Sequence, residues 1–138
     1  MDNLAPYTYI FSVPSVSTYQ HLRLGAGLSG KSTEAATLGL KNTLFAVQVL
    51  SGDEAVGMGR VIGDGGCFFQ VVDIAVLKAH QGRGLGKLIM REIKNYLDLH
   101  TPDSAYISLI ADGKAHLLYE QFGFVQVAPK SVGMAYKK

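Results

Sequence analysis

Hydrophobic and polar positions along the chain follow two different spacings, and each spacing predicts one kind of element. Alternation with a period of two, or a short continuous apolar run, indicates a strand. A period near 3.6 residues indicates an amphipathic helix. By these rules, strands are predicted over residues 7–12, 43–50, 55–62, 67–77, 105–111, 124–128 and 132–136.

The strongest helical pattern spans residues 84–99, and Pro102 stops it. Its apolar side chains recur three or four positions apart: Leu85, Leu88, Ile89, Ile93, Tyr96 and Leu97. Shorter helices are predicted over residues 17–25, capped by Ser17, and over residues 33–40 and 114–122. This order of elements predicts the α/β class, with a mixed sheet and helices on its faces.

The length and composition fit one globular domain spanning residues 1–138. The 138 residues match a typical domain of about 100–150 residues. The net charge of +2 comes with no run of basic residues, so we expect no nucleic-acid partner. No window holds the roughly 18 uncharged apolar residues of a membrane span, and no basic segment begins a signal peptide. We therefore expect no membrane partner and a cytoplasmic protein.

The single cysteine, Cys67, excludes an intramolecular disulfide. It precedes Phe68 and Phe69, so we expect a buried structural thiol. No spacing of His, Cys and Asp indicates a metal site, and we expect none.

A glycine-rich turn joins a predicted strand to the long helix. The first backbone N–H groups of a helix have no partner within it and carry the positive end of its dipole. Glycines allow phosphate oxygens to approach that backbone, and basic side chains add charge. The turn is therefore predicted to bind a pyrophosphate. Its residues are Gln81, Gly82, Arg83, Gly84, Leu85, Gly86 and Lys87.

Residues 81–86 resemble motif A of the GNAT acetyltransferases, Gln/Arg-x-x-Gly-x-Gly/Ala. Residues 112–124, D-G-K-A-H-L-L-Y-E-Q-F-G-F, are similar to motif B of that family, N-x-x-A-x-x-x-Y-x-x-x-G-F. Asp112 stands where the family commonly has an Asn that contacts the cofactor. Residues 57–66, with the run V-x-D-I-x-V-x-x-x-x-Q-G-x-G-L-G at 71–86, resemble most closely the subgroup of serotonin N-acetyltransferase-like proteins that act on small amines.

The resemblance implies a GNAT fold with a mostly antiparallel sheet. Two neighbouring parallel strands, ending near Val76 and Ala111, would splay apart to admit acetyl-CoA as co-substrate. The main chain of Ile74, Ala75 and Val76 would pair with its pantetheine arm. The family transfers the acetyl group directly to an amine, and we expect a small-molecule amine rather than a protein. A homodimer is a common assembly in the family.

Two residues are candidates for proton transfer. By resemblance, Tyr119 lies against the cofactor and matches the position of the family's general acid, which protonates the leaving thiolate. The alternative is that Tyr119 only packs beside the cofactor. Asp73 is an ionisable group in an otherwise apolar strand, and a charge there needs a reason. Asp73 is a candidate general base, and the alternative is a structural partner for Arg60. His80 is expected to be solvated in its loop.

Two further interpretations stay open at this point. Residues 25–32, G-A-G-L-S-G-K-S, match the nucleotide-binding P-loop pattern G-x-x-x-x-G-K-S/T. A P-loop must follow a buried strand, whereas the residues before this segment are predicted to be helical. The second alternative is an acyl-CoA-binding module that regulates a partner without catalysis.

Overall fold

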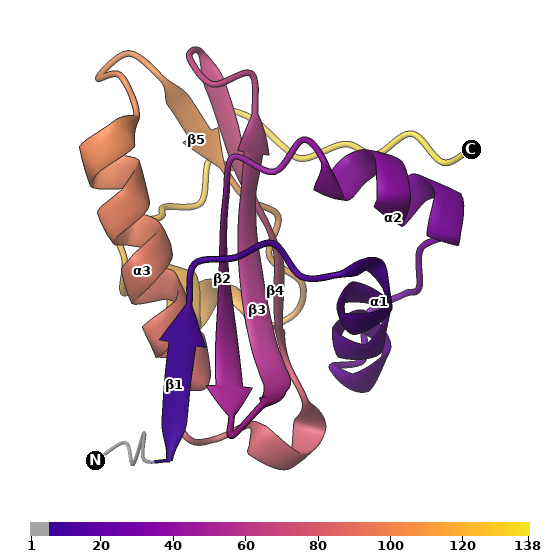
Figure 1. The fold of residues 1–138 in the computed structure, drawn as a ribbon. Coiled ribbons are helices and arrows are strands. Elements are labelled where there is room, and N and C mark those ends of the chain that lie inside the picture. The colour runs from indigo at the N-terminus through magenta and orange to yellow at the C-terminus, as the bar shows by residue number, and fades with distance from the viewer. Residues whose placement is uncertain (1–5) are drawn as a thin grey trace.

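The computed structural model describes residues 6–138, which form a five-stranded sheet with helices on both faces (Figure 1). The elements are β1 (Tyr7–Ile10), α1 (Val16–Gly25), α2 (Thr33–Leu40), β2 (Phe45–Ser51), β3 (Glu54–Gly63), β4 (Phe68–Val76), the 3₁₀ turn η1 (Lys78–His80), α3 (Leu85–His100), β5 (Tyr106–Ser108) and α4 (His116–Glu120).

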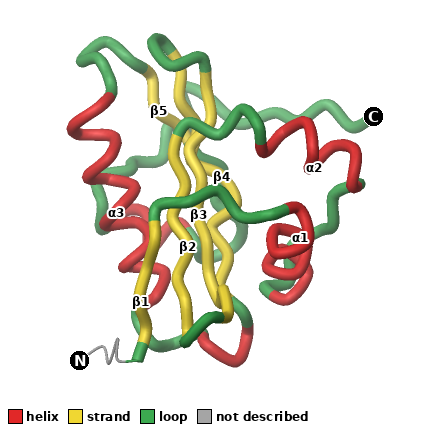
Figure 2. The backbone as a smooth tube through the Cα atoms, in the orientation of Figure 1, coloured by secondary structure: helices red, strands yellow, loops and turns green. Residues whose placement is uncertain are grey.

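The strands lie in the sheet in the same order as in the sequence, β1-β2-β3-β4-β5 (Figure 2). The three pairings from β1 to β4 are antiparallel. Short turns join β2 to β3 and β3 to β4, whereas α1 and α2 lie between β1 and β2 in the sequence. β5 pairs with β4 in parallel, and α3 makes the crossover between them. The predicted α/β class and the mostly antiparallel mixed sheet are confirmed.

Each face of the sheet has its own apolar core. α3 covers one face, and α1 and α2 cover the other (Figure 1). The helical spacing predicted for residues 84–99 is confirmed, since Leu85, Leu88, Ile89, Ile93 and Leu97 are all buried against the sheet. The smaller core on the other face is formed by Tyr19, Leu22, Ala36, Leu40, Met58 and Ala75.

The close approach of α3 to β3 depends on Gly59. A Cβ atom at Gly59 would lie 2.6 Å from Ile89 Cγ2 and 2.8 Å from Cδ1 of both Ile74 and Ile93. Carbon atoms pack at about 3.5–4.0 Å, so an added methyl group would force these side chains out of place. We expect Gly59→Ala to lower the free energy of unfolding by about 1–3 kcal/mol in urea denaturation. Gly39→Ala in α2 is the control, because no atom lies within 4 Å of a Cβ added there, and it should stabilise the protein by about 1 kcal/mol. Equal losses of stability in both variants would contradict this packing of α3 against β3.

Several local predictions are wrong. The hydroxyl of Ser15, not Ser17, caps α1, accepting a hydrogen bond from the Thr18 N–H at 3.2 Å. Cys67 is exposed, because it lies at the end of the hairpin before β4. The strands predicted at 124–128 and 132–136 are irregular, since neither run pairs with a neighbour. Within residues 6–138, no helix is long and apolar enough to span a membrane.

Candidate active site

The sheet opens between β4 and β5. The two strands pair at only three positions, the last of which joins Gln70 to Ser108. β4 continues to Val76, whereas β5 ends at Ser108. Beyond Gln70, this edge of β4 therefore has no strand partner within the described residues 6–138. Ile74, Ala75 and Val76 lie on this open stretch, where the sequence predicts the splay.

A β-bulge bends β4 within the open stretch. Arg60 of β3 faces Val72, and Met58 faces Ala75, so two residues of β4 lie opposite Gly59 alone. Asp73, one of those two, has φ of 59°, a conformation uncommon for residues other than glycine. The bulge bends β4 just after the last residue that pairs with β5. Bulges of this kind often lie beside active sites.

The open edge of β4 leads directly to the N-terminus of α3. Gly84 is the N-cap in the left-handed conformation, with φ of 84°, and Gly82 has φ of 77°. The first-turn N–H groups of α3 have no partners within the helix. The side-chain amide of Gln81 donates to the Val76 carbonyl at 2.9 Å and so ties the turn to the end of β4.

The predicted phosphate residues divide by exposure. Gln81, Gly82, Arg83 and Lys87 are exposed, so their groups are accessible to a ligand. Leu85 is buried in the core, which leaves only its main chain for binding. A Cβ atom added at Gly86 would lie 3.2 Å from Leu118 Cδ2, so α3 packs closely against Leu118 at this position. Free N–H groups, two left-handed glycines and two exposed cations fit a pyrophosphate group.

A cluster that the sequence analysis missed holds this turn against β1. The Tyr7 hydroxyl lies 2.7 Å from His80 Nδ1 and accepts a hydrogen bond from Arg83 Nη1 at 2.9 Å. The rings of Tyr7 and His80 also meet edge to face. His80 is therefore half-buried rather than solvated. No local signal reveals this cluster, because Tyr7 and His80 are 73 positions apart.

Asp73 lies in a buried network of charges, with its side chain 6% exposed. One carboxylate oxygen accepts from Arg23 Nη1 at 2.6 Å, and the other accepts from Arg60 Nη1 at 2.7 Å. The Tyr19 hydroxyl donates to the same carboxylate, and burial is the largest cause of its raised pKa, followed by the Asp73 charge. The predicted pairing with Arg60 is confirmed, whereas Arg23 and Tyr19 carried no signal in the sequence.

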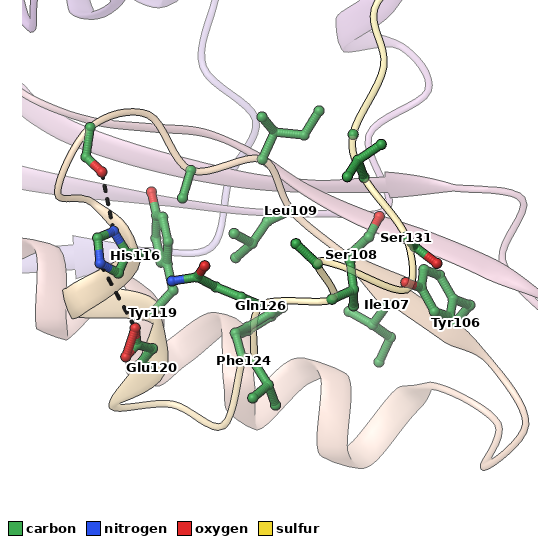
Figure 3. Close-up of a pocket in the computed structure, with 18 residues that line it drawn as sticks. Tyr106, Ile107, Ser108, Leu109, His116, Tyr119, Glu120, Phe124, Gln126 and Ser131 are labelled. Carbon is green, nitrogen blue, oxygen red and sulfur yellow. Dashed lines mark hydrogen bonds and ion pairs between the residues drawn. The ribbon is translucent and has the colours of Figure 1, made fainter.

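Tyr119 lies on α4 and lines a cavity of about 520 Å³ together with His116 and Gln126 (Figure 3). Burial raises the pKa of the Tyr119 hydroxyl above its ordinary 10.0, and the nearby Asp112 raises it further. The phenol therefore keeps its proton at neutral pH, as a general acid must. His116 is held by its own turn, with Nδ1 3.1 Å from the Gly113 carbonyl oxygen.

The P-loop alternative is wrong for residues 25–32. A helix, α1, leads into this segment in place of the buried strand that a P-loop requires. Lys31 exchanges main-chain hydrogen bonds with the side chain of Gln20, and Ser32 caps α2 by accepting from the Ala35 N–H at 3.0 Å. These groups serve the connection between two helices.

The fold and this site define an acetyltransferase of the GNAT type. The family model described as the acetyltransferase (GNAT) domain matches residues 41–126. A protein of unknown function from meticillin-resistant Staphylococcus aureus, described as a probable acetyltransferase, is 48% identical. That match covers 96% of this chain and 99% of the other, with a TM-score of 0.90. The chain belongs to the GNAT acetyltransferase family.

More distant structures share the fold. A GNAT family acetyltransferase from Streptococcus pneumoniae is 24% identical over 96% of this chain and 98% of that one, with a TM-score of 0.78. The ribosomal-protein-S18-alanine N-acetyltransferase of Escherichia coli is 17% identical over 88% of this chain and 80% of that one, with a TM-score of 0.71. A search of curated proteins finds no match.

Proposed function

We propose that this protein transfers the acetyl group of acetyl-CoA directly to a primary amine. One observation carries the proposal: the open edge of β4 runs into the free N–H groups of α3, and Gln81 ties the two together. An extended arm and a pyrophosphate joined in one ligand fit these two adjoining sites. Acetyl-CoA, when bound, supplies a thioester that an amine can attack.

The residues of the chain would divide the work. The main chain of Ile74, Ala75 and Val76 would pair with the pantetheine arm, and a backbone N–H near Val76 would donate to the developing oxyanion. The first turn of α3, with Arg83 and Lys87, would hold the phosphates. Tyr119 would hold a proton for the leaving sulfur, which its raised pKa supports.

The geometry favours Asp73 as a positioning residue rather than the general base. Both oxygens of its buried carboxylate already accept hydrogen bonds from cations. Through Arg23, Asp73 orients α1 and the loop that follows it, because Arg23 Nε also donates to the Ser29 carbonyl at 2.7 Å. A water molecule would then take the proton of the amine.

We infer that the acceptor is a small amine. The loop over residues 25–30 is held down by Arg23, which donates to both the carbonyl and the hydroxyl of Ser29. Because these hydrogen bonds fix the loop beside α1, the loop leaves less room for a polypeptide acceptor than an open groove would. The resemblance of residues 57–66 and 71–86 to serotonin N-acetyltransferase-like proteins supports the same class of acceptor.

Calorimetric titration with acetyl-CoA tests the binding site through Gly84→Glu. A carboxylate about 5 Å from a phosphate costs roughly 3 kcal/mol at an effective dielectric constant of 20. Since about 1.4 kcal/mol is a factor of ten, we expect the affinity for acetyl-CoA to fall more than 100-fold.

Gly84→Ala is the matched control, because it introduces the same left-handed strain without the charge. It should lose some stability but retain most of the affinity. Equal losses of affinity in the two variants would place the phosphates elsewhere. Binding of ATP–Mg²⁺ in place of acetyl-CoA would overturn the proposed function.

A further inference from the structure

A small cavity lies between α1, α2 and β3, on the face of the sheet opposite α3 (Figure 1). Its volume is about 250 Å³. Tyr19, Lys31 and Arg60 form its polar wall, and α2 contributes an apolar wall made of Ala35, Ala36, Gly39 and Leu40. Sites for drug-sized ligands usually measure roughly 300–1,000 Å³, so this cavity fits one end of a small molecule.

The cavity adjoins the bulge of β4. The Tyr19 hydroxyl and Arg60 Nη1 both donate to the Asp73 carboxylate, at 3.0 Å and 2.7 Å. Asp73 directly precedes Ile74, and Ala75 belongs to the same apolar core as Tyr19. One side chain therefore separates the cavity from the stretch of β4 that we propose to pair with the pantetheine arm.

The buried part of the polar wall carries more positive charge than its partners neutralise. Arg23 and Arg60 share the single carboxylate of Asp73, and their side chains are only 11% and 7% exposed. Neither arginine forms another ion pair within residues 6–138. The Tyr19 hydroxyl stays uncharged at neutral pH, because burial and the Asp73 charge raise its pKa. One net positive charge therefore remains beside the cavity.

Arg60 also keeps donors that a ligand can use. Each of its three nitrogens makes one hydrogen bond, to Thr43 Oγ1, Asp73 and the Gly39 carbonyl. A guanidinium Nη atom carries two N–H groups, so in the described part of the chain each Nη of Arg60 has one N–H to spare.

Lys31 adds a second cation to the same wall. Its main chain is fixed by Gln20, whose Oε1 accepts from the Lys31 N–H at 3.1 Å. Its ammonium group is exposed and forms no ion pair with a carboxylate of residues 6–138. No acidic side chain is among the described residues that line the cavity. Because buried charge is stabilised by an opposite charge, the cavity has the chemistry of an anion site.

We propose that this cavity binds an acidic group of the acceptor, which is then a short primary amine with a carboxylate or a phosphate at its other end. The inference rests on the proposed acetyl transfer and names its substrate class. With the acid held by Lys31 and Arg60, the amine at the other end of the molecule reaches the open edge of β4. A second ammonium group in place of the acid would be repelled by the same two cations, so diamines are poor acceptors.

The transfer keeps the chemistry already proposed. The amine nitrogen forms a bond to the acetyl carbon, and the carbon–sulfur bond of the thioester breaks. One proton leaves the nitrogen for water, and the thiolate takes one from Tyr119. The acidic group takes no part in these steps and only positions the amine.

Kinetics with matched amines test the substrate class. Amino acids with the amine and the carboxylate at opposite ends of three to six carbon atoms are compared with alkylamines and diamines of the same length. Aminoalkyl phosphates, compared with the corresponding amino alcohols, distinguish a phosphate from a carboxylate. We expect the better acidic series to exceed its uncharged counterpart at least tenfold in kcat/KM, with the diamines lowest. Equal or faster transfer to alkylamines or diamines would overturn the acidic class and leave the proposed acetyl transfer standing.

A charge variant tests the cavity itself. Lys31→Gln keeps the main-chain hydrogen bonds to Gln20 and should lower kcat/KM for the best acidic amine about tenfold, mainly through a higher KM. Lys41→Gln is the matched control, because Lys41 is an exposed lysine at the C-terminal end of α2 that does not line the cavity. It should leave kcat/KM within about twofold. Equal effects of the two variants would contradict a specific contact with Lys31.

Binding without turnover separates this inference from the proposed function. In an NMR titration with CoA present, 4-aminobutyrate or 3-aminopropyl phosphate should shift the signals of Arg60 Nε and of the amides of residues 35–39, whereas butylamine should not. The absence of these shifts with both acidic amines would overturn the site, even if acetyl transfer is observed. Shifts without any release of CoA would uphold the anion site and contradict the acetyl transfer instead.

Discussion

Replacement of Tyr119 by phenylalanine should lower kcat by about 10²–10⁴-fold, the usual contribution of a positioned acid. Tyr119→Phe removes only the hydroxyl, and its ring keeps its place in the wall of the cavity. The affinity for acetyl-CoA should therefore change by less than about threefold. Steady-state kinetics with the best amine, together with calorimetry, measure both quantities.

The pH profile gives an independent test of the same role. Burial, with Asp112, raises the pKa of the Tyr119 hydroxyl above 10.0, so the acid stays protonated across the neutral and mildly alkaline range. We therefore expect no fall in kcat from this group below about pH 10. Tyr96→Phe on α3, where the ring stacks on Phe45, is the matched control and should leave kcat unchanged. An unchanged kcat in Tyr119→Phe would remove the acid role.

Replacement of Asp73 by alanine should lower the free energy of unfolding by about 3–5 kcal/mol. The variant leaves Arg23 and Arg60 buried without their shared carboxylate, and breaking a buried ion pair on one side costs about this much. The loop after α1 should also loosen, since Arg23 links Asp73 to Ser29. Urea denaturation measures the first effect, and proteolysis between residues 25 and 32 measures the second.

Asp98→Ala is the matched control, because Asp98 forms an exposed pair with Lys94 and is 61% exposed. Its loss should change the stability by less than about 1 kcal/mol. The kinetics of Asp73→Asn then separate the two interpretations of Asp73. A positioning residue predicts a several-fold loss of kcat that follows the loss of stability. A 10²-fold or larger loss of kcat in a stable variant would restore Asp73 as the general base.

The sequence predicts the parts of this fold that depend on neighbouring residues. The apolar spacing of α3 and the glycines of the turn before it are local, so both are visible without a structure. The strand pattern of β4 is local in the same way. Arg60 could be predicted as a partner of Asp73 because the two residues lie on adjacent strands that a short turn joins.

Contacts between distant parts of the chain could not be predicted in this way. Arg23 lies 50 positions from Asp73, and Tyr7 lies 76 positions from Arg83; the fold alone brings them together. The strands predicted at 124–128 and 132–136 illustrate a related limit. Alternation indicates that a segment can form a strand, but it does not provide the neighbour with which that strand must pair. Without that neighbour in the same chain, both segments remain irregular.

Acetyl transfer by this protein is tested by the release of free CoA from acetyl-CoA in the presence of a panel of amines. Thiol detection follows the release, and mass spectrometry of the amine identifies the product. We expect CoA release that depends on a small primary amine, with one acetyl group added to that amine for each CoA formed. Binding of acetyl-CoA without transfer to any small amine or peptide would contradict it and leave a binding module in its place.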